Sequence, residues 1–490
     1  MTIWFYSYSS FGFKLNLDCA EGKRARPFRH QNEKGELVMA ADVQGLSVTA
    51  NSHSIDALDR AISDYYAWKG DPVGLLMGAA DADPKFSLGY SASASLLLLS
   101  GFTRSNPMVA EALQGAERTV SEANPRERKH LEAAKAWAAG EMIRATTIWE
   151  DILLDHPRDA LALRFCHDTY FYLGASQTIR DSVARVLPHW SHSDPAYGYV
   201  LGQYAFGLEE CSELRHAEKV AYQAIEINEE DGWAVHALAH VMETESRQED
   251  GIRFLRNSQP AWRKAHALAA HNGWHLALYL IEQQRFDEVL ASYDKFVQPK
   301  INSDAILDLV DAASLLWRIE LAGGSVGNRW RDISRQWMHH VDEHVLAFND
   351  LHIAFCAARS DDADDATRLR ASLDRYDREG TGDNHRITRS IGREIIEAML
   401  AFGEGNYGRC VDLILPLRYD AIRVGGSHAQ RDIIGQTLIV AAERAGRMTL
   451  ARALLNERLA QRPTSATEQH LAHVVKAVTA GHNLSALNML

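Results

Sequence analysis

The sequence predicts an all-α protein, an α-solenoid of irregular tetratricopeptide-like helix hairpins with a concave pocket. From Ser54 onward apolar residues recur with the period of a helix, and the alternation typical of strands is nearly absent. Small residues also recur at about the 34-residue spacing of tetratricopeptide repeats. The chain is 46% hydrophobic and has only 12 prolines in 490 residues, so it can bury a large core.

The N-terminal segment 1–38 differs from the rest of the chain. It is first aromatic and rich in Ser, then basic, and it lacks a helical period. We expect it to be poorly ordered or appended, with a natural protein start at Met39. Residues 39–480 are predicted to form one tetratricopeptide-like solenoid, and residues 481–490 a C-terminal tail.

The expected hairpins follow one another along the solenoid, and each is recognised by the small or apolar residues where its two helices approach. The marker positions are Ala133, Ala145, Trp149 and Pro157, then Ala205, Ala217 and Ala224, then Gly251, then Ala277 with Val289 and Tyr293, and finally the pairs Ala354/Ala366, Ala398/Cys410 and Ile439/Ala451. In such a stack the first helix of each hairpin lines the concave surface. The inward positions are aromatic and polar here, which favours a ligand pocket. They include Tyr199, Phe206, Glu209, Trp233, Glu243 and Trp274.

Two histidine pairs stand out in the middle of the chain. His236 and His240 lie four residues apart, and so do His271 and His275. On a helix this spacing places both rings of a pair on one face. Two neighbouring first helices would therefore present four imidazoles to the same concave surface.

Three interpretations of these histidines remain open. They could ligate Zn²⁺ or another transition metal, although neither pair is an HExxH motif. They could form a packed hydrogen-bond network. They could also act in acid–base catalysis beside a carboxylate, for which Glu209, Glu210, Glu243 and Asp350 are available and His352 is a further candidate. No cofactor is predicted, and a divalent metal such as zinc is the less favoured alternative.

The segment GGSHAQRD (residues 425–432) is a second candidate. Ser427 is a suitable N-cap for the helix that follows. His428 and Arg431 would stand on its first turn, where free N–H groups favour an anion. The alternative is an ordinary capped helix whose Arg431 pairs with an acidic side chain.

Charge and composition exclude several classes of partner. The net charge of −13 and the lack of a Lys/Arg stripe argue against binding to nucleic acid or an anionic membrane. The five cysteines are widely spaced and fit reduced thiols of a cytoplasmic protein. No apolar run is long enough to span a bilayer. A homo-oligomer is compatible with the sequence.

Several motifs together resemble the tetratricopeptide repeat protein 38 family over residues 40–480. They are YAFGLEE (204–210), WAVHALAHVME (233–243), AHNGWHLALY (270–279), FNDLH (348–352) and GGSHAQRD (425–432). The resemblance implies an all-helical solenoid and no defined reaction. A generic repeat does not require these His, Trp and Asp residues.

Two functions follow from these observations. The first is a small-molecule enzyme or binder, with hydrolytic or proton-transfer chemistry and no organic cofactor, acting on a ligand that could be anionic. The alternative is a non-catalytic scaffold that binds a peptide or protein partner in its groove. The clustering of Trp and His favours the first function, and enzyme activity is left open.

Overall fold

The structure is a computed structural model that describes residues 41–266, 268–303, 305–462 and 465. Within these residues helices follow one another along the whole chain, and the only β-type pairing is an isolated bridge between Ala41 and Ser47. The prediction of an all-α solenoid is confirmed. The predicted segment 1–38 and tail 481–490 lie outside the described residues.

The helices of the first half of the chain are α1 (Ser52–Tyr66), α2 (Pro72–Ala82), α3 (Ser87–Leu99), α4 (Pro107–Thr119), α5 (Pro125–Ala138), α6 (Met142–Asp155), α7 (Ala160–Tyr172), α8 (Ser176–Val186), α9 (Tyr197–Glu210), α10 (Leu214–Ile227), α11 (Gly232–Thr244) and α12 (Gln248–Asn257). Those of the second half are α13 (Gln259–Trp262), α14 (Ala269–Glu282), α15 (Phe286–Ser292), α16 (Ile306–Leu321), α17 (Trp330–Trp337), α18 (Ala347–Ala357), α19 (Asp365–Glu379), α20 (Gly382–Ile387), α21 (Arg393–Gly403), α22 (Tyr407–Ile414), α23 (His428–Arg444) and α24 (Met448–Gln461). Short 3₁₀ or π turns extend several of them.

The same turn joins the two helices of successive hairpins. Gly140, Gly174, Ser212, Ser246 and Gln284 all have a left-handed backbone at the end of a first helix, roughly one 34-residue repeat apart. In each case the residue that follows donates its backbone N–H to a carbonyl five residues earlier, as in a Schellman motif. This recurring turn makes the hairpins equivalent in spite of their irregular lengths.

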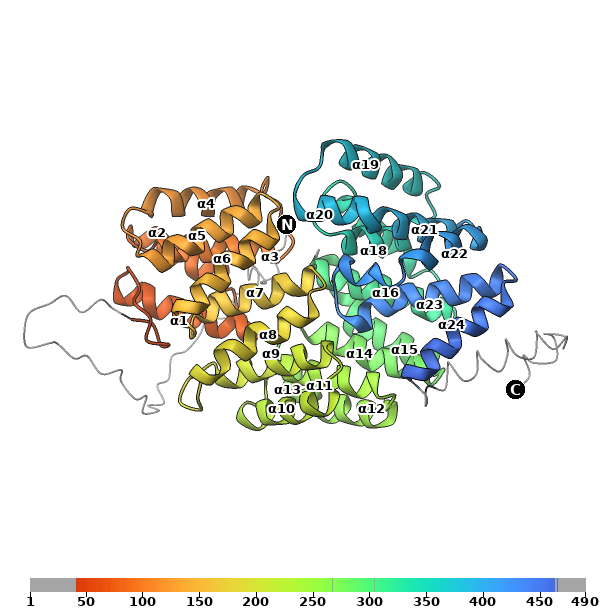
Figure 1. Cartoon of the computed structure of the whole chain (residues 1–490), viewed down its shortest axis with the longest axis horizontal. Coiled ribbons are helices and arrows are strands. Elements are labelled where there is room, and N and C mark those ends of the chain that lie inside the picture. The colour runs from red at the N-terminus through yellow and green to blue at the C-terminus, as the bar shows by residue number, and fades with distance from the viewer. Residues whose placement is uncertain (1–40, 267, 304, 463–464, 466–490) are drawn as a thin grey trace, which may run out of the picture.

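The solenoid curves back on itself, so that α20 and the turn before α23 contact the turn after α5 and the end of α7 (Figure 1). The backbone N–H of Asp383 donates to the Gly140 carbonyl at 2.8 Å, and that of Gly426 donates to the Phe171 carbonyl at 3.1 Å. A Cβ at Gly425 would lie 2.3 Å from the Tyr172 carbonyl oxygen, so only glycine permits this close approach.

Closure turns the concave surface into the interior of the molecule. Helices α9, α11, α14 and α16 pack one after another, and α16 packs on α23 across the ring. The inward residues of the first helices are therefore buried rather than exposed in an open groove. In the described part of the chain no helix is long and apolar enough to cross a bilayer.

Candidate functional site

Four imidazoles meet at the centre of this interior. His236 and His240 come from α11, His271 and His275 from α14, and each of these residues is at most 4% exposed. Nε2 of His236 lies 2.9 Å from Nε2 of His240 and 3.1 Å from Nε2 of His271. Each of the four rings offers a nitrogen within 4.8 Å of the others. The i, i+4 spacing and the packing of two equivalent helices produce this convergence, as the sequence predicted.

Carboxylates stand behind three of the four rings. Nδ1 of His271 lies 2.9 Å from both oxygens of Asp311 on α16. Nδ1 of His275 lies 3.3 Å from Oε2 of Glu243. Nδ1 of His240 lies 3.4 Å from Oε2 of Glu209 on α9, and the two atoms do not form a hydrogen bond.

Aromatic side chains enclose the imidazoles. The Phe206 ring stacks on His236 with centroids 5.3 Å apart, and Trp233 lies 4.6 Å from the same ring. Trp274 stacks on His271 at 5.2 Å with an interplanar angle of 10°. These predicted site residues therefore surround the cluster and shield it from water.

Burial decides the protonation of the cluster. It lowers the pKa of His236 and His275 well below the ordinary value, and it lowers the pKa of His240 to about 4. Neighbouring imidazoles act in the same direction for all three. These rings are therefore neutral near pH 7, and each carries a lone pair that can accept a proton or bind a metal ion. Burial also raises the pKa of Glu209 to about 8.

The start of α23 adjoins the cluster through Glu209. Ser427 caps the helix, because its side chain accepts from the backbone N–H of Gln430. Nε2 of His428 lies 2.6 Å from Oε1 of Glu209. Glu210 accepts from the backbone N–H of His428 at 2.8 Å and from Arg431 at 3.2 Å.

This arrangement agrees with the second of the two interpretations, a capped helix whose Arg431 pairs with an acidic side chain. The place predicted for an external anion at the start of α23 is filled by the protein's own Glu210 carboxylate. Burial raises the pKa of Glu210, but the charges of His428 and Arg431 more than offset this and bring it to about 2. The ionised carboxylate therefore satisfies Arg431 within the fold.

Three predicted site residues have other partners. Asp350, expected beside the histidine pairs, lies 3.1 Å from Nδ1 of His344. Nδ1 of His352 lies 2.7 Å from the carbonyl oxygen of Phe348. Tyr199 packs its ring 5.9 Å from that of Tyr66. Asp311, which does reach the cluster, was missed, although an aspartate inside the apolar run ILDLVDAASLLW was a signal.

An apolar cavity of about 100 Å³ borders the cluster. Its walls come from helices far apart in the chain, and two of its lining residues are His236 and His271. The other walls are mainly apolar or aromatic, among them Leu96, Trp137, Phe171, Val310 and Phe348. Asn349 and Gln430 add polar groups to the lining. A small ligand in this cavity would therefore meet apolar walls and the edge of the imidazole cluster.

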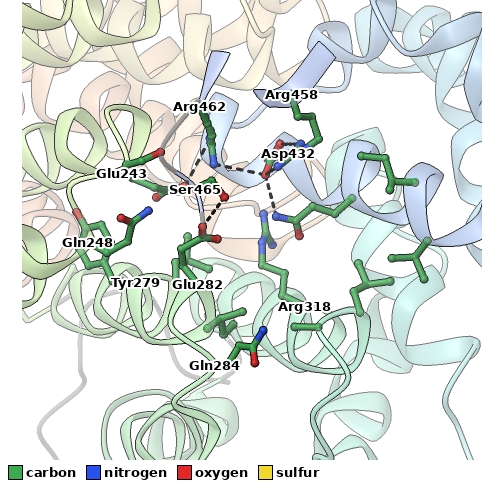
Figure 2. Close-up of a pocket in the computed structure, with 18 of the residues that line it drawn as sticks. Glu243, Gln248, Tyr279, Glu282, Gln284, Arg318, Asp432, Arg458, Arg462 and Ser465 are labelled. Carbon is green, nitrogen blue, oxygen red and sulfur yellow. Dashed lines mark hydrogen bonds and ion pairs between the residues drawn. The ribbon is translucent and has the colours of Figure 1, made fainter. Parts of the chain in front are cut away.

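A second cavity, of about 130 Å³, is lined by charged side chains (Figure 2). Asp432 lies 2.5 Å from Arg458, and Arg462 lies 3.9 Å from both Asp432 and Glu243. Glu243 thus contacts His275 and also borders this cavity. The charges at its wall are largely matched by each other.

Comparison with known proteins shows a likeness in fold only. No protein-family model matches the chain. The human IFIT1 dimer with m7Gppp-AAAA is 12% identical, with a TM-score of 0.38, and the match covers 90% of this chain and 96% of that one. The human IFIT1 dimer with PPP-AAAA is 12% identical with a TM-score of 0.38, covering 80% and 91%. Naa15/Naa10 bound to HypK-THB is 12% identical with a TM-score of 0.23, covering 89% and 67%.

Proposed function

We propose that the protein binds a small, mainly apolar molecule in the cavity beside the four histidines and carries out hydrolytic or proton-transfer chemistry on it. The observation that carries this proposal is the meeting of an apolar cavity with His236 and His271. An enclosed apolar pocket with a few convergent polar groups is the usual form of a small-molecule site. The apolar walls would contact the apolar part of the ligand, and a polar group of the ligand would face the imidazole cluster.

The size and lining of the cavity narrow the ligand. A volume of about 100 Å³ suits a molecule of the size of a small aromatic ring. Among the lining side chains Asp168, His236, Asn349 and Gln430 can hydrogen-bond to a carbonyl or hydroxyl group, whereas both ring nitrogens of His271 already face Asp311 and His236. A neutral ester, amide or alcohol with a compact apolar body fits this combination better than a strongly charged ligand. The earlier expectation of an anion has less support, because Glu210 occupies the site where one was expected.

The alternative function is the non-catalytic scaffold for a peptide or protein partner. The three similar structures hold m7Gppp-AAAA, PPP-AAAA or a protein complex. Their TM-scores of 0.38 and 0.23 give no basis for assigning those ligands to this chain. The interior of the ring is filled by side chains, which leaves less room there for a peptide than an open groove would. The resemblance to the tetratricopeptide repeat protein 38 family is compatible with either function.

A binding and turnover assay tests the proposal. The full chain is titrated with benzyl alcohol and benzamide, and hydrolysis of the small ester ethyl acetate is followed by the acid that it releases. We expect saturable binding that Val310→Phe abolishes, because the larger side chain fills the cavity. Val440→Phe, which lines the charged cavity, is the matched control and should leave binding unchanged. Binding or turnover that is equal in wild type and Val310→Phe would contradict the proposal.

A further inference from the structure

We propose that His236, His240, His271 and His275 form a binding site for one divalent first-row transition metal ion. This site goes beyond the proposed function, because it can be tested without any organic ligand. Four buried, mutually facing imidazoles on two rigid helices are the first observation. The carboxylates behind three of them are the second.

The distances suit a metal ion. A tetrahedral ion with metal–nitrogen bonds of about 2.0–2.1 Å holds its ligand nitrogens about 3.3 Å apart. The Nε2 atoms of His236 and His240 are separated by 2.9 Å, and those of His236 and His271 by 3.1 Å. Movements of a few tenths of an ångström would bring these pairs to the ligand geometry. His275 completes the set within the same 4.8 Å limit.

The carboxylates determine which ring nitrogen faces the centre. Asp311 accepts from Nδ1 of His271, and Glu243 accepts from Nδ1 of His275, so these nitrogens carry the protons. The Nε2 atoms of both rings therefore present lone pairs. Metal-bound histidines are characteristically held in this way, with the other ring nitrogen on a carboxylate. Glu209 stands in the corresponding place behind His240.

Hydrogen bonding alone does not satisfy the cluster. Nε2 of His236 faces two other Nε2 atoms, and a single N–H can be directed at only one of them. Nε2 of His275, the nitrogen that this ring would offer to the metal, has no hydrogen-bond partner among the described residues. Buried nitrogens without partners are costly to a fold. A cation at the centre would meet the facing lone pairs, and the carboxylates of Asp311 and Glu243 would help to balance its charge.

The ligand set indicates the class of metal. Imidazole nitrogens suit Zn²⁺, Cu²⁺, Ni²⁺ and Fe²⁺, whereas Mg²⁺ and Ca²⁺ prefer oxygen ligands. The neighbouring group of Glu209, Glu210 and His428 is a poorer site, because Arg431 and the backbone N–H of His428 already occupy Glu210. We therefore assign the metal to the four imidazoles.

Metal analysis of the purified full chain tests the site. The protein is stripped with a chelator, dialysed against Zn²⁺ or Co²⁺, and analysed for bound metal. We expect equimolar uptake and, with Co²⁺, the intense visible absorption of a four-coordinate ion. His275→Gln and His271→Gln should lose this uptake. His344→Gln is the control, since this buried histidine pairs with Asp350 outside the cluster.

Asp311→Asn is a further test variant. It keeps all four imidazoles, so its result does not depend on whether the histidine variants fold. It should retain the metal with an affinity about 10–100-fold lower, because the carboxylate no longer orients His271. A folded wild-type chain that takes up none of Zn²⁺, Co²⁺, Cu²⁺, Ni²⁺ and Fe²⁺ would overturn the metal site. If that metal-free chain still bound benzyl alcohol in a Val310-dependent way, the proposed function would stand without it.

Discussion

Two of the buried histidine–aspartate contacts among the described residues serve different ends. Between α5 and α7, His130 lies 3.0 Å from Asp159, and Arg126 donates to the same carboxylate at 2.6 Å. At the centre of the ring, Asp311 contacts His271, whose other ring nitrogen faces His236. The first region contains its own cation. In the second region the Nε2 lone pair of His271 faces the group of the other three imidazoles.

This difference separates a structural contact from a candidate site. Asp159 also accepts from the backbone N–H of Ala162 at 2.8 Å, so its charge is fully engaged and holds the start of α7. In the histidine cluster Glu243 orients the ring of His275, whose Nε2 has no hydrogen-bond partner among the described residues. Nδ1 of His130 also has no hydrogen-bond partner among the described residues, so the difference lies in the geometry. Around Asp159 the protein supplies its own cation, Arg126, whereas in the cluster four imidazoles face one another.

The largest expected effect is the loss of stability on removal of the Asp159 carboxylate. Asp159→Ala leaves the buried Arg126 without its carboxylate, so the free energy of unfolding should fall by about 3–5 kcal/mol. Urea unfolding followed by circular dichroism measures the loss. Asp155→Ala removes a carboxylate that pairs with Lys129 at the surface and is the matched control, with little change expected. Equal losses in the two variants would show that the buried pair is not special.

The second prediction concerns Asp311, whose replacement should affect metal affinity more than stability. Asp311→Asn in the metal-free protein should reduce the free energy of unfolding by only about 1–3 kcal/mol, because it weakens one buried hydrogen bond. Its main effect should be on metal affinity, measured by competition with a chromophoric chelator. His130→Gln should leave that affinity unchanged. A reduced affinity in His130→Gln would mean that the two regions are coupled.

The pH dependence of stability gives a further prediction for Asp159. Burial raises the pKa of Asp159, but His130 and Arg126 more than offset this and hold it well below its usual range. The folded state therefore binds this proton less readily than the unfolded chain, in which the pKa is about 3.9. The contribution of Asp159 is present above that value and is lost as the pH falls toward the folded pKa.

Comparing wild type with Asp159→Asn at several pH values tests this sign. The difference in unfolding free energy should be constant from about pH 7 to about pH 5 and should shrink below about pH 4. Urea titrations at each pH supply the measurement. A difference that grows on acidification would show that Asp159 is not ionised in the fold.

The smallest expected effect concerns the start of α23. As around Asp159, the charged side chains there are paired with one another. Ser427→Ala removes the N-cap, so stability should fall by about 1 kcal/mol. Metal uptake should not change, since the cap touches none of the four histidines. Thermal unfolding and metal content measure the two effects. A loss of metal in this variant would place α23 within the site.

Local patterns in the sequence were sufficient for the repeats and for the histidine faces. Small residues at a near-constant spacing indicated the hairpins, and the i, i+4 spacing fixed which rings share a side of α11 and α14. The closure of the ring was beyond such patterns, because it depends on contacts such as that of His428 with Glu209, 219 residues away. The same limit explains the errors at the site. Asp350 was assigned to the cluster by its residue type, while Asp311 is the aspartate that the packing of α16 on α14 brings there.

The most direct test of the central claim is a crystal structure of the metal-loaded full chain with anomalous diffraction data at the absorption edge of the bound ion. We predict one strong anomalous peak surrounded by the Nε2 atoms of His236, His240, His271 and His275, with Asp311 and Glu243 still on the opposite ring nitrogens. A loaded chain with its peak at Glu210 and His428, or with no peak inside the ring, would contradict the account.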